Sequence, residues 1–152
     1  MGEALKGWTT KVSVGRTAGE VQEMLGMAGA GEIMIRYEHK RPVGVSFTLD
    51  MPGGKSAFAM PINVDGVAAV LRRQVNHSVV RPRSGLTREL LLSAEHAERV
   101  AWRIARDWLD AQLALVEAGM VTLQTTMLPY LLITPTETLA QRFASSGLRE
   151  LT

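Results

Sequence analysis

The sequence predicts an α+β fold: a four-stranded antiparallel sheet in the chain order β-α-β-β-β-α, with a long helix and a short C-terminal helix packed on one face. Three observations predict it. Four short segments alternate apolar and polar residues, as half-buried strands do. Short turns rich in glycine and proline separate the last three of these segments, so their strands run antiparallel. Elsewhere apolar residues recur at helical spacing, and 152 residues with 46% apolar content fit a single domain over residues 1–152.

The N-terminal part supplies the first strand and the first helix. Residues 1–7 are expected to fray. In residues 8–14 the apolar side chains share one parity, which predicts a strand. Thr17 and Glu20 then have the spacing of a capping box, in which each side chain satisfies a helix N–H group, and the helix they open is expected to stop at Gly29.

Three further strands are expected in quick succession, over residues 32–38, 43–50 and 55–62. Each alternates apolar and polar side chains. The connections are a bend at residues 39–42 and a Pro-Gly-Gly turn at residues 51–54, where glycine supplies positive φ.

The middle of the chain is predicted as two helices with a loop between them. Asn63 is a suitable N-cap for a helix over residues 64–74. Residues 75–90 lose the helical period and contain Pro, Gly, Asn and Ser, which predicts a mobile basic loop within the domain. Ser93 then caps the longest helix, at about residues 94–119, whose wide apolar arc predicts burial against several neighbours.

The C-terminal part is expected to hold one more helix. Residues 121–133 form an apolar connection that must be covered. Thr134 and Glu137 match a second capping box, which predicts a helix that runs to about Ser146 and ends at Gly147.

Two residues of the long helix lie at informative positions. Gln112 falls within the apolar arc, so its amide needs hydrogen-bond partners from a neighbouring backbone or a subunit contact. Trp102 lies near the border of the arc and is a candidate interface residue. The acidic residues on the polar side stand at i+4 from arginines, which predicts helix-surface ion pairs for Arg103 with Asp107 and Arg106 with Asp110.

Composition and motifs exclude most enzyme classes. The absence of cysteine excludes a disulfide framework, a thiolate metal site and a cysteine nucleophile. No apolar run approaches a membrane span, and the N-terminus does not read as a signal peptide. The three histidines, His39, His77 and His96, lack metal-ligand spacing, and His96 is expected at an exposed helix start. No phosphate-binding loop or nucleophile elbow occurs, so we expect no catalytic residues, no metal and no cofactor.

The charge is more informative than the motifs. The net charge is +2, yet the window of residues 72–106 holds eight arginines against three glutamates, a local +5 that leaves −3 for the rest. Arginine offers a planar fork of donors that suits phosphate or carboxylate. The window is either a solvated surface or an anion-binding site. As candidate nucleic-acid-binding residues it contains Arg72, Arg73, Arg81, Arg83, Arg88, Arg99, Arg103 and Arg106.

The open face of the predicted sheet is polar. Without aromatic side chains it does not suit base stacking, although contacts to phosphates or a plain solvated surface stay open. Its expected members are Lys11, Ser13, Arg36, Glu38, Ser46 and Thr48.

The long helix carries a family resemblance. The segment from Ala97 to Met120, with Leu128-Pro-Tyr130 after it, resembles small α+β proteins of bacteriophages and prophages, a group without established activity. The strand segments at 33–37 and 58–64 are similar to the same group, and the similarity spans residues 8–135. The resemblance implies a phage origin and a location in the cytoplasm of the infected host, and it transfers no site residues.

These observations favour a small non-enzymatic nucleic-acid-binding protein that contacts phosphates through its arginines, with the loop at residues 75–90 ordering on binding. The alternative is a phage-encoded protein-interaction module that docks on a host or virion protein. Neither function requires a membrane, and uncovered sheet edges leave a homo-oligomer open.

Overall fold

The computed structural model describes residues 2–147 and confirms an α+β fold with antiparallel sheets. The helices in this range are α1 (Val14–Met27), α2 (Val64–Asn76), α3 (Arg88–Leu91), α4 (Ala94–Glu117), α5 (Leu123–Met127), the 3₁₀ turn η1 (Leu128–Tyr130) and α6 (Leu139–Ser146). The strands are β1 (Ile33–Glu38), β2 (Arg41–Met51), β3 (Gly54–Ala59), β4 (Leu132–Thr134) and β5 (Glu137–Thr138). No helix in this range is both long and apolar enough to cross a bilayer.

The predicted four-stranded sheet is wrong in its composition. The strands form a three-stranded sheet in the order β1-β2-β3 and a separate two-stranded sheet of β4 and β5. An isolated bridge between Phe58 and Leu131 brings the second sheet beside β3. The three predicted hairpin strands are correct because their turns fix the pairing locally, with His39 and Lys40 both at positive φ between β1 and β2.

Residues 8–14 do not form the predicted strand. The segment turns at residues 6–9, and α1 begins at Val14 after Ser13, whose hydroxyl accepts the Arg16 N–H at 3.2 Å. Alternating parity alone cannot make a strand without a neighbour to pair with. Thr17, expected to cap this helix, is instead fully buried inside it.

The predicted start of the last helix is also wrong, because the helix begins at a second pattern of the same kind four residues later. Thr134 ends β4 and Glu137 begins β5, so this Thr-x-x-Glu sequence spans a hairpin turn. Four residues later Thr138 and Gln141 form the capping box that opens α6. Glu137 is engaged elsewhere, because Arg142 donates from Nε and Nη2 to its two carboxylate oxygens, each at 3.0 Å.

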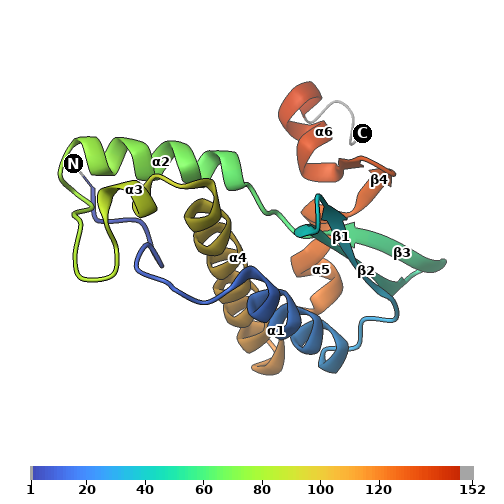
Figure 1. Ribbon diagram of the computed structural model, residues 1–152. Helices are drawn as coiled ribbons and strands as arrows, with labels where there is room; N and C mark the ends of the chain where they lie inside the picture. The colour runs from blue at the N-terminus through green and yellow to red at the C-terminus, as the bar shows by residue number, and fades with distance from the viewer. Residues whose placement is uncertain (1, 148–152) are drawn as a thin grey trace.

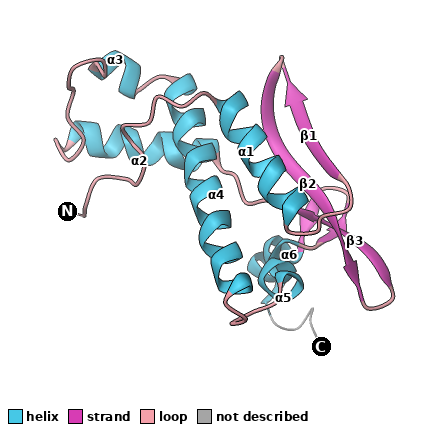
Figure 2. Ribbon diagram, turned by 90° about the horizontal axis from the view of Figure 1, so that it is seen from below, coloured by secondary structure: helices cyan, strands magenta, loops and turns pink. Residues whose placement is uncertain are grey.

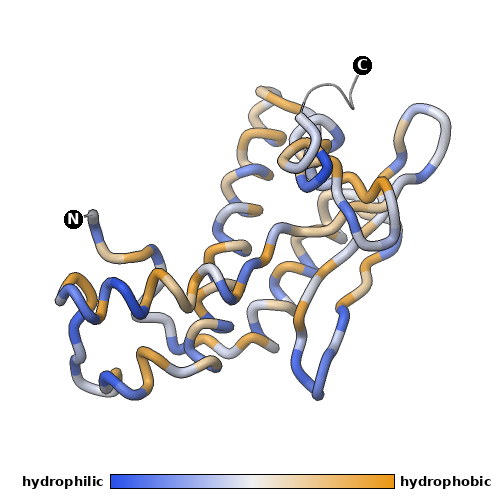
Figure 3. The backbone as a smooth tube through the Cα atoms, turned by 90° about the horizontal axis from the view of Figure 1, so that it is seen from above, coloured by the Kyte–Doolittle hydropathy of each residue, from blue (hydrophilic) through white to orange (hydrophobic). Residues whose placement is uncertain are grey.

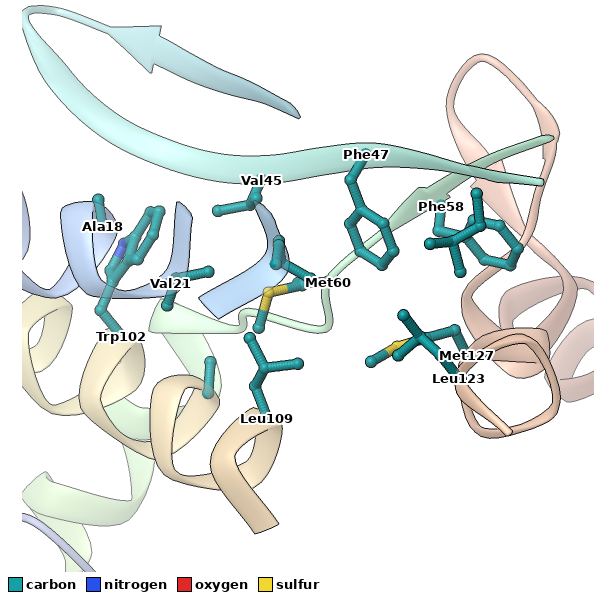
Figure 4. Packing of buried hydrophobic residues seen from close by; sticks show 13 residues of the cluster. Ala18, Val21, Val45, Phe47, Phe58, Met60, Trp102, Leu109, Leu123 and Met127 are labelled. Carbon is teal, nitrogen blue, oxygen red and sulfur yellow. The ribbon is translucent and has the colours of Figure 1, made fainter. Parts of the chain in front are cut away.

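The main core lies between the sheet and the helices on one of its faces. Figure 4 shows Val45, Phe47 and Phe58 pointing from the sheet toward α1, α4 and α5. The rings of Phe47 and Phe58 stack with centroids 5.6 Å apart. Trp102, expected at the border of the apolar arc, is fully buried in this core.

A second packed region lies at the other end of α4. Figure 2 shows α2, α3 and the N-terminal segment at one end of the molecule, with α4 running from there toward α5. Trp8 packs in this region, against clusters that contain Leu71 and Val80. The Leu5 N–H donates to the Gln74 side-chain oxygen at 2.8 Å, which fastens the N-terminal segment to α2.

Candidate nucleic-acid interface

The C-terminal half of α2 directs two arginines away from the protein. Leu71 and Val75, four residues apart, are buried against the neighbouring helices. Arg72 and Arg73 fall between them in sequence and are exposed. Asn63 caps the other end of α2 by accepting the Gly66 N–H at 2.9 Å, as the sequence predicted.

The loop after α2 is anchored by apolar side chains. Val80, Leu86 and Leu91 are buried together with Val75. The Arg83 and Leu86 backbones exchange hydrogen bonds of 3.0 and 2.8 Å and close a tight turn. The loop is shorter than predicted, because α2 continues to Asn76 and α3 begins at Arg88. The expected mobility stays a prediction, but the backbone of this segment has its own small core.

The five arginines between residues 72 and 88 keep most of their donors available. Each is exposed, and none forms an ion pair with another residue in the described range 2–147. Arg81 donates from Nε to the Ser78 carbonyl at 3.0 Å, and Arg88 donates from Nη2 to Asn76 Oδ1 at 3.0 Å. A guanidinium has five N–H donors, so each of these two retains several for an anion.

A lysine that sequence reasoning did not assign to this site joins it. The Lys11 Nζ lies 2.5 Å from the position that a Cβ would occupy at Gly85, so the ammonium sits against the turn. Lys11 was expected on the open sheet face, and the failure of that strand prediction explains why it was missed. We call the set the basic end: it comprises Lys11, Arg72, Arg73, Arg81, Arg83 and Arg88. Figure 3 shows hydrophilic residues along this end of α2 and the loop after it.

Two arginines of α4 are engaged inside the protein instead. Arg103 donates from Nη1 to Glu20 Oε2 at 2.6 Å, which ties α4 to α1. Arg106 lies 3.7 Å from the same oxygen, donates to Asp107 Oδ1 at 3.2 Å and pairs with Asp110 at 3.8 Å. The expected pair of Arg106 with Asp110 is present, whereas Arg103 reaches α1 rather than Asp107.

Arg99 belongs with this α4 group rather than with the basic end. It is half-buried, and its Nε is enclosed without a hydrogen-bond partner in the described part of the chain.

An arginine from the sheet neutralises the acidic residues of the same window. Arg41 donates to Glu95 at 2.9 Å and to Glu98 at 3.0 Å, and these two carboxylates raise the pKa of its guanidinium. Two of the three glutamates that oppose the arginines in sequence are therefore paired with Arg41. The third, Glu89, is exposed.

His96 is not at an exposed helix start, which corrects the sequence-based expectation. It is fully buried, and its Nε2–H donates to the Trp8 carbonyl at 2.7 Å. Burial lowers the pKa of His96, and the nearby Arg99 acts in the same direction. The residue is a neutral anchor for the N-terminal segment, because Ser93 places it in the first turn of α4, facing inward.

The described residues contain no group of three or more His, Asp or Glu side chains that could hold a metal ion. The amide of Gln112 accepts a hydrogen bond from the Thr126 hydroxyl at 3.2 Å, so its partner is a side chain of α5.

No protein-family model matches this chain, and neither does any curated protein or solved structure. The similarity to phage proteins therefore stays a prediction.

Proposed function

We propose that this protein binds nucleic acid through the basic end, contacts phosphates rather than bases, and carries out no reaction of its own. The observation that carries the proposal is that five exposed arginines between residues 72 and 88, with Lys11 beside them, have no carboxylate partner in the described part of the chain. Cationic side chains without internal carboxylate partners leave an uncompensated positive charge on this part of the chain, and such a charge attracts a polyanion.

The site is smaller than the eight arginines of the sequence window. Arg103 and Arg106 hold α4 against α1 and the carboxylates beside them, so their charge is largely compensated within the protein. We assign nucleic-acid contact to the basic end and a structural role to these two. Phosphate contact without an exposed aromatic platform at this end supports binding that depends weakly on sequence.

The test is fluorescence anisotropy with labelled single- and double-stranded oligonucleotides at low ionic strength. Wild type is expected to bind, and the double variant Arg81→Gln with Arg83→Gln is expected to bind about tenfold or more weakly, because removing one arginine–phosphate interaction costs roughly 1 kcal/mol. The matched control, Arg36→Gln with Lys55→Gln, removes the same charge from the three-stranded sheet and should bind as wild type does. Equal binding by all three proteins, or none by wild type, would refute the proposal.

A protein-interaction module is the second candidate, and the exposed methionines favour it. Met27 and Met120 are 84% and 71% exposed, and methionine adapts to varied apolar partners. A module of this kind would not bind nucleic acid at any salt concentration. The phage resemblance implies that such a module acts in the cytoplasm of an infected host.

A further inference from the structure

A groove of about 790 Å³ lies on the sheet face opposite the core. In Figure 1, α6 and β4 lie above the three-stranded sheet and α1 lies below it. The groove runs between the upper face and α6. Its floor consists of residues that alternate with the core residues along β2 and β3, namely Gly44, Ser46, Ala57 and Ala59.

Small residues keep the groove open on its floor and on the side of α6 that faces the floor. On the α6 side it is lined by Ala140 and Ala144, and α6 buries none of its residues. The helix is held instead by the β4–β5 hairpin and η1, which fix it at a distance from the sheet. Tyr130 and Leu132 close the end of the groove beside β3.

One positive charge stands at the β1 end of the groove. Arg36 pairs with Gly44 across the β1–β2 ladder, and its Nη2 lies 3.4 Å from the position of a Cβ at Gly44, so the guanidinium lies flat on the sheet. It is the one charged residue among the described residues that line the groove. No described residue makes a hydrogen bond or an ion pair with it. An anionic group fits this end.

The rest of the lining offers few polar groups to a ligand. The floor is the face of a sheet whose strands are already paired with one another. Among the wall residues, Thr138 and Gln141 bond each other in the α6 capping box, at 2.8 and 3.3 Å. A peptide would find few partners in this lining for its own backbone N–H and C=O groups. A hydrocarbon chain has no such groups.

We propose that this groove binds an elongated apolar carboxylate of the fatty-acid class. The carboxylate accepts hydrogen bonds from the Arg36 guanidinium in the planar geometry that this pair favours. The chain crosses β2 at Gly44 and Ser46 and passes over Ala59, which pairs with Ser46. It ends near Leu132, with Ala57 beside it on the floor. Three strand spacings of ~4.8 Å give a path of about 14 Å, which an extended medium-length acyl chain fills. The volume of the groove lies within the range of small-ligand sites.

Isothermal titration with dodecanoate, below the concentration at which it forms micelles, tests the proposal. Wild type is expected to bind one equivalent. Arg36→Gln should weaken dodecanoate binding about tenfold or more while leaving dodecanol binding unchanged, because only the carboxylate uses the guanidinium. Ala57→Leu, which fills the floor, should abolish the binding of both compounds.

Two controls keep the outcome decisive. Phe143→Ser removes an exposed apolar side chain of α6 that does not line the groove and should bind dodecanoate as wild type does. Thermal melting should show that Arg36→Gln and Ala57→Leu remain folded. Failure of wild type to bind, equal loss of dodecanol and dodecanoate in Arg36→Gln, or unchanged binding by folded Ala57→Leu would each overturn the proposal. None of these titrations or melting experiments depends on nucleic-acid binding.

Discussion

The affinity of this protein for duplex nucleic acid should fall steeply with salt, and the structure sets the steepness. The basic end presents six cationic side chains, five arginines and Lys11. Each phosphate neutralised on a duplex releases counterions and contributes about −0.9 to the slope of log affinity against log salt concentration. If all six contact phosphates, the slope is about −5.4, and affinity falls roughly two-thousandfold between ~50 and ~200 mM salt.

The double variant Arg81→Gln with Arg83→Gln makes that expectation specific. Four cations remain, so the slope should decrease to about −3.6, and the same rise in salt should reduce affinity only roughly a hundredfold. The measurement is anisotropy with one labelled duplex at four or five salt concentrations, with circular dichroism to show that both proteins are folded. A single strand should give a shallower slope, about −0.7 for each phosphate.

Arg103→Gln is the control that separates the basic end from the wider arginine window. Its guanidinium already holds Glu20 at 2.6 Å, so its removal should reduce thermal stability and leave the salt slope unchanged. A slope for wild type no steeper than about −2, or the same slope in wild type and the double variant, would refute the assignment of phosphate contacts to these residues. A slope changed by Arg103→Gln would return the α4 arginines to the site.

Burial lowers the pKa of His96, so below its ordinary value of 6.5 the unfolded chain takes up a proton that the folded protein resists, and stability is lost as the pH falls through 6.5. Melting temperatures between pH 8 and pH 5 should show this loss in wild type and a flatter profile in His96→Gln. Gly85→Ala and Gly119→Ala both place alanine at positive φ and should each cost about 1 kcal/mol, but only at Gly85 does the new Cβ meet the Lys11 ammonium, so only Gly85→Ala should also weaken nucleic-acid binding. Phe58→Ala removes a fully buried ring and should lower the free energy of unfolding by about 3–5 kcal/mol in urea titrations, whereas a loss below 1 kcal/mol would mean that the core relaxes around the cavity.

The elements that sequence reasoning located correctly are those specified by short-range interactions. Asn63 and Ser93 cap their helices through N–H groups three residues away. The β1–β2 and β2–β3 hairpins are fixed by turns whose residues accept or supply positive φ. In each case the residues that decide the structure are neighbours in the chain, so the sequence pattern contains the whole interaction.

The errors occur where the deciding contact is distant in sequence. Trp8 looked like the first residue of a strand, but its carbonyl accepts from His96, 88 residues away, and its ring packs under α2. Two patterns near the C-terminus, Thr134 with Glu137 and Thr138 with Gln141, both have the spacing of a capping box, so the local sequence does not distinguish them. The bridge from Leu131 to Phe58 in β3 draws the chain before the first pattern into a strand, so the helix starts at the second one.

The arginine window shows why a charge count along the chain overstates a binding site. Glu20 lies 83 residues before Arg103, and Arg41 lies 54 and 57 residues before the glutamates that it neutralises. Glu20 and Arg41 both lie outside the window. The sum of +5 therefore includes Arg103, whose charge Glu20 compensates, and two glutamates, whose charge Arg41 compensates. The remaining charge depends on the fold. The arginines on α2 and on the loop after it form no ion pair in the described range, and the buried side chains of this region are apolar. Arginines that have no carboxylate partner in the folded protein therefore indicate an anion-binding surface more strongly than the net charge of their stretch of sequence does.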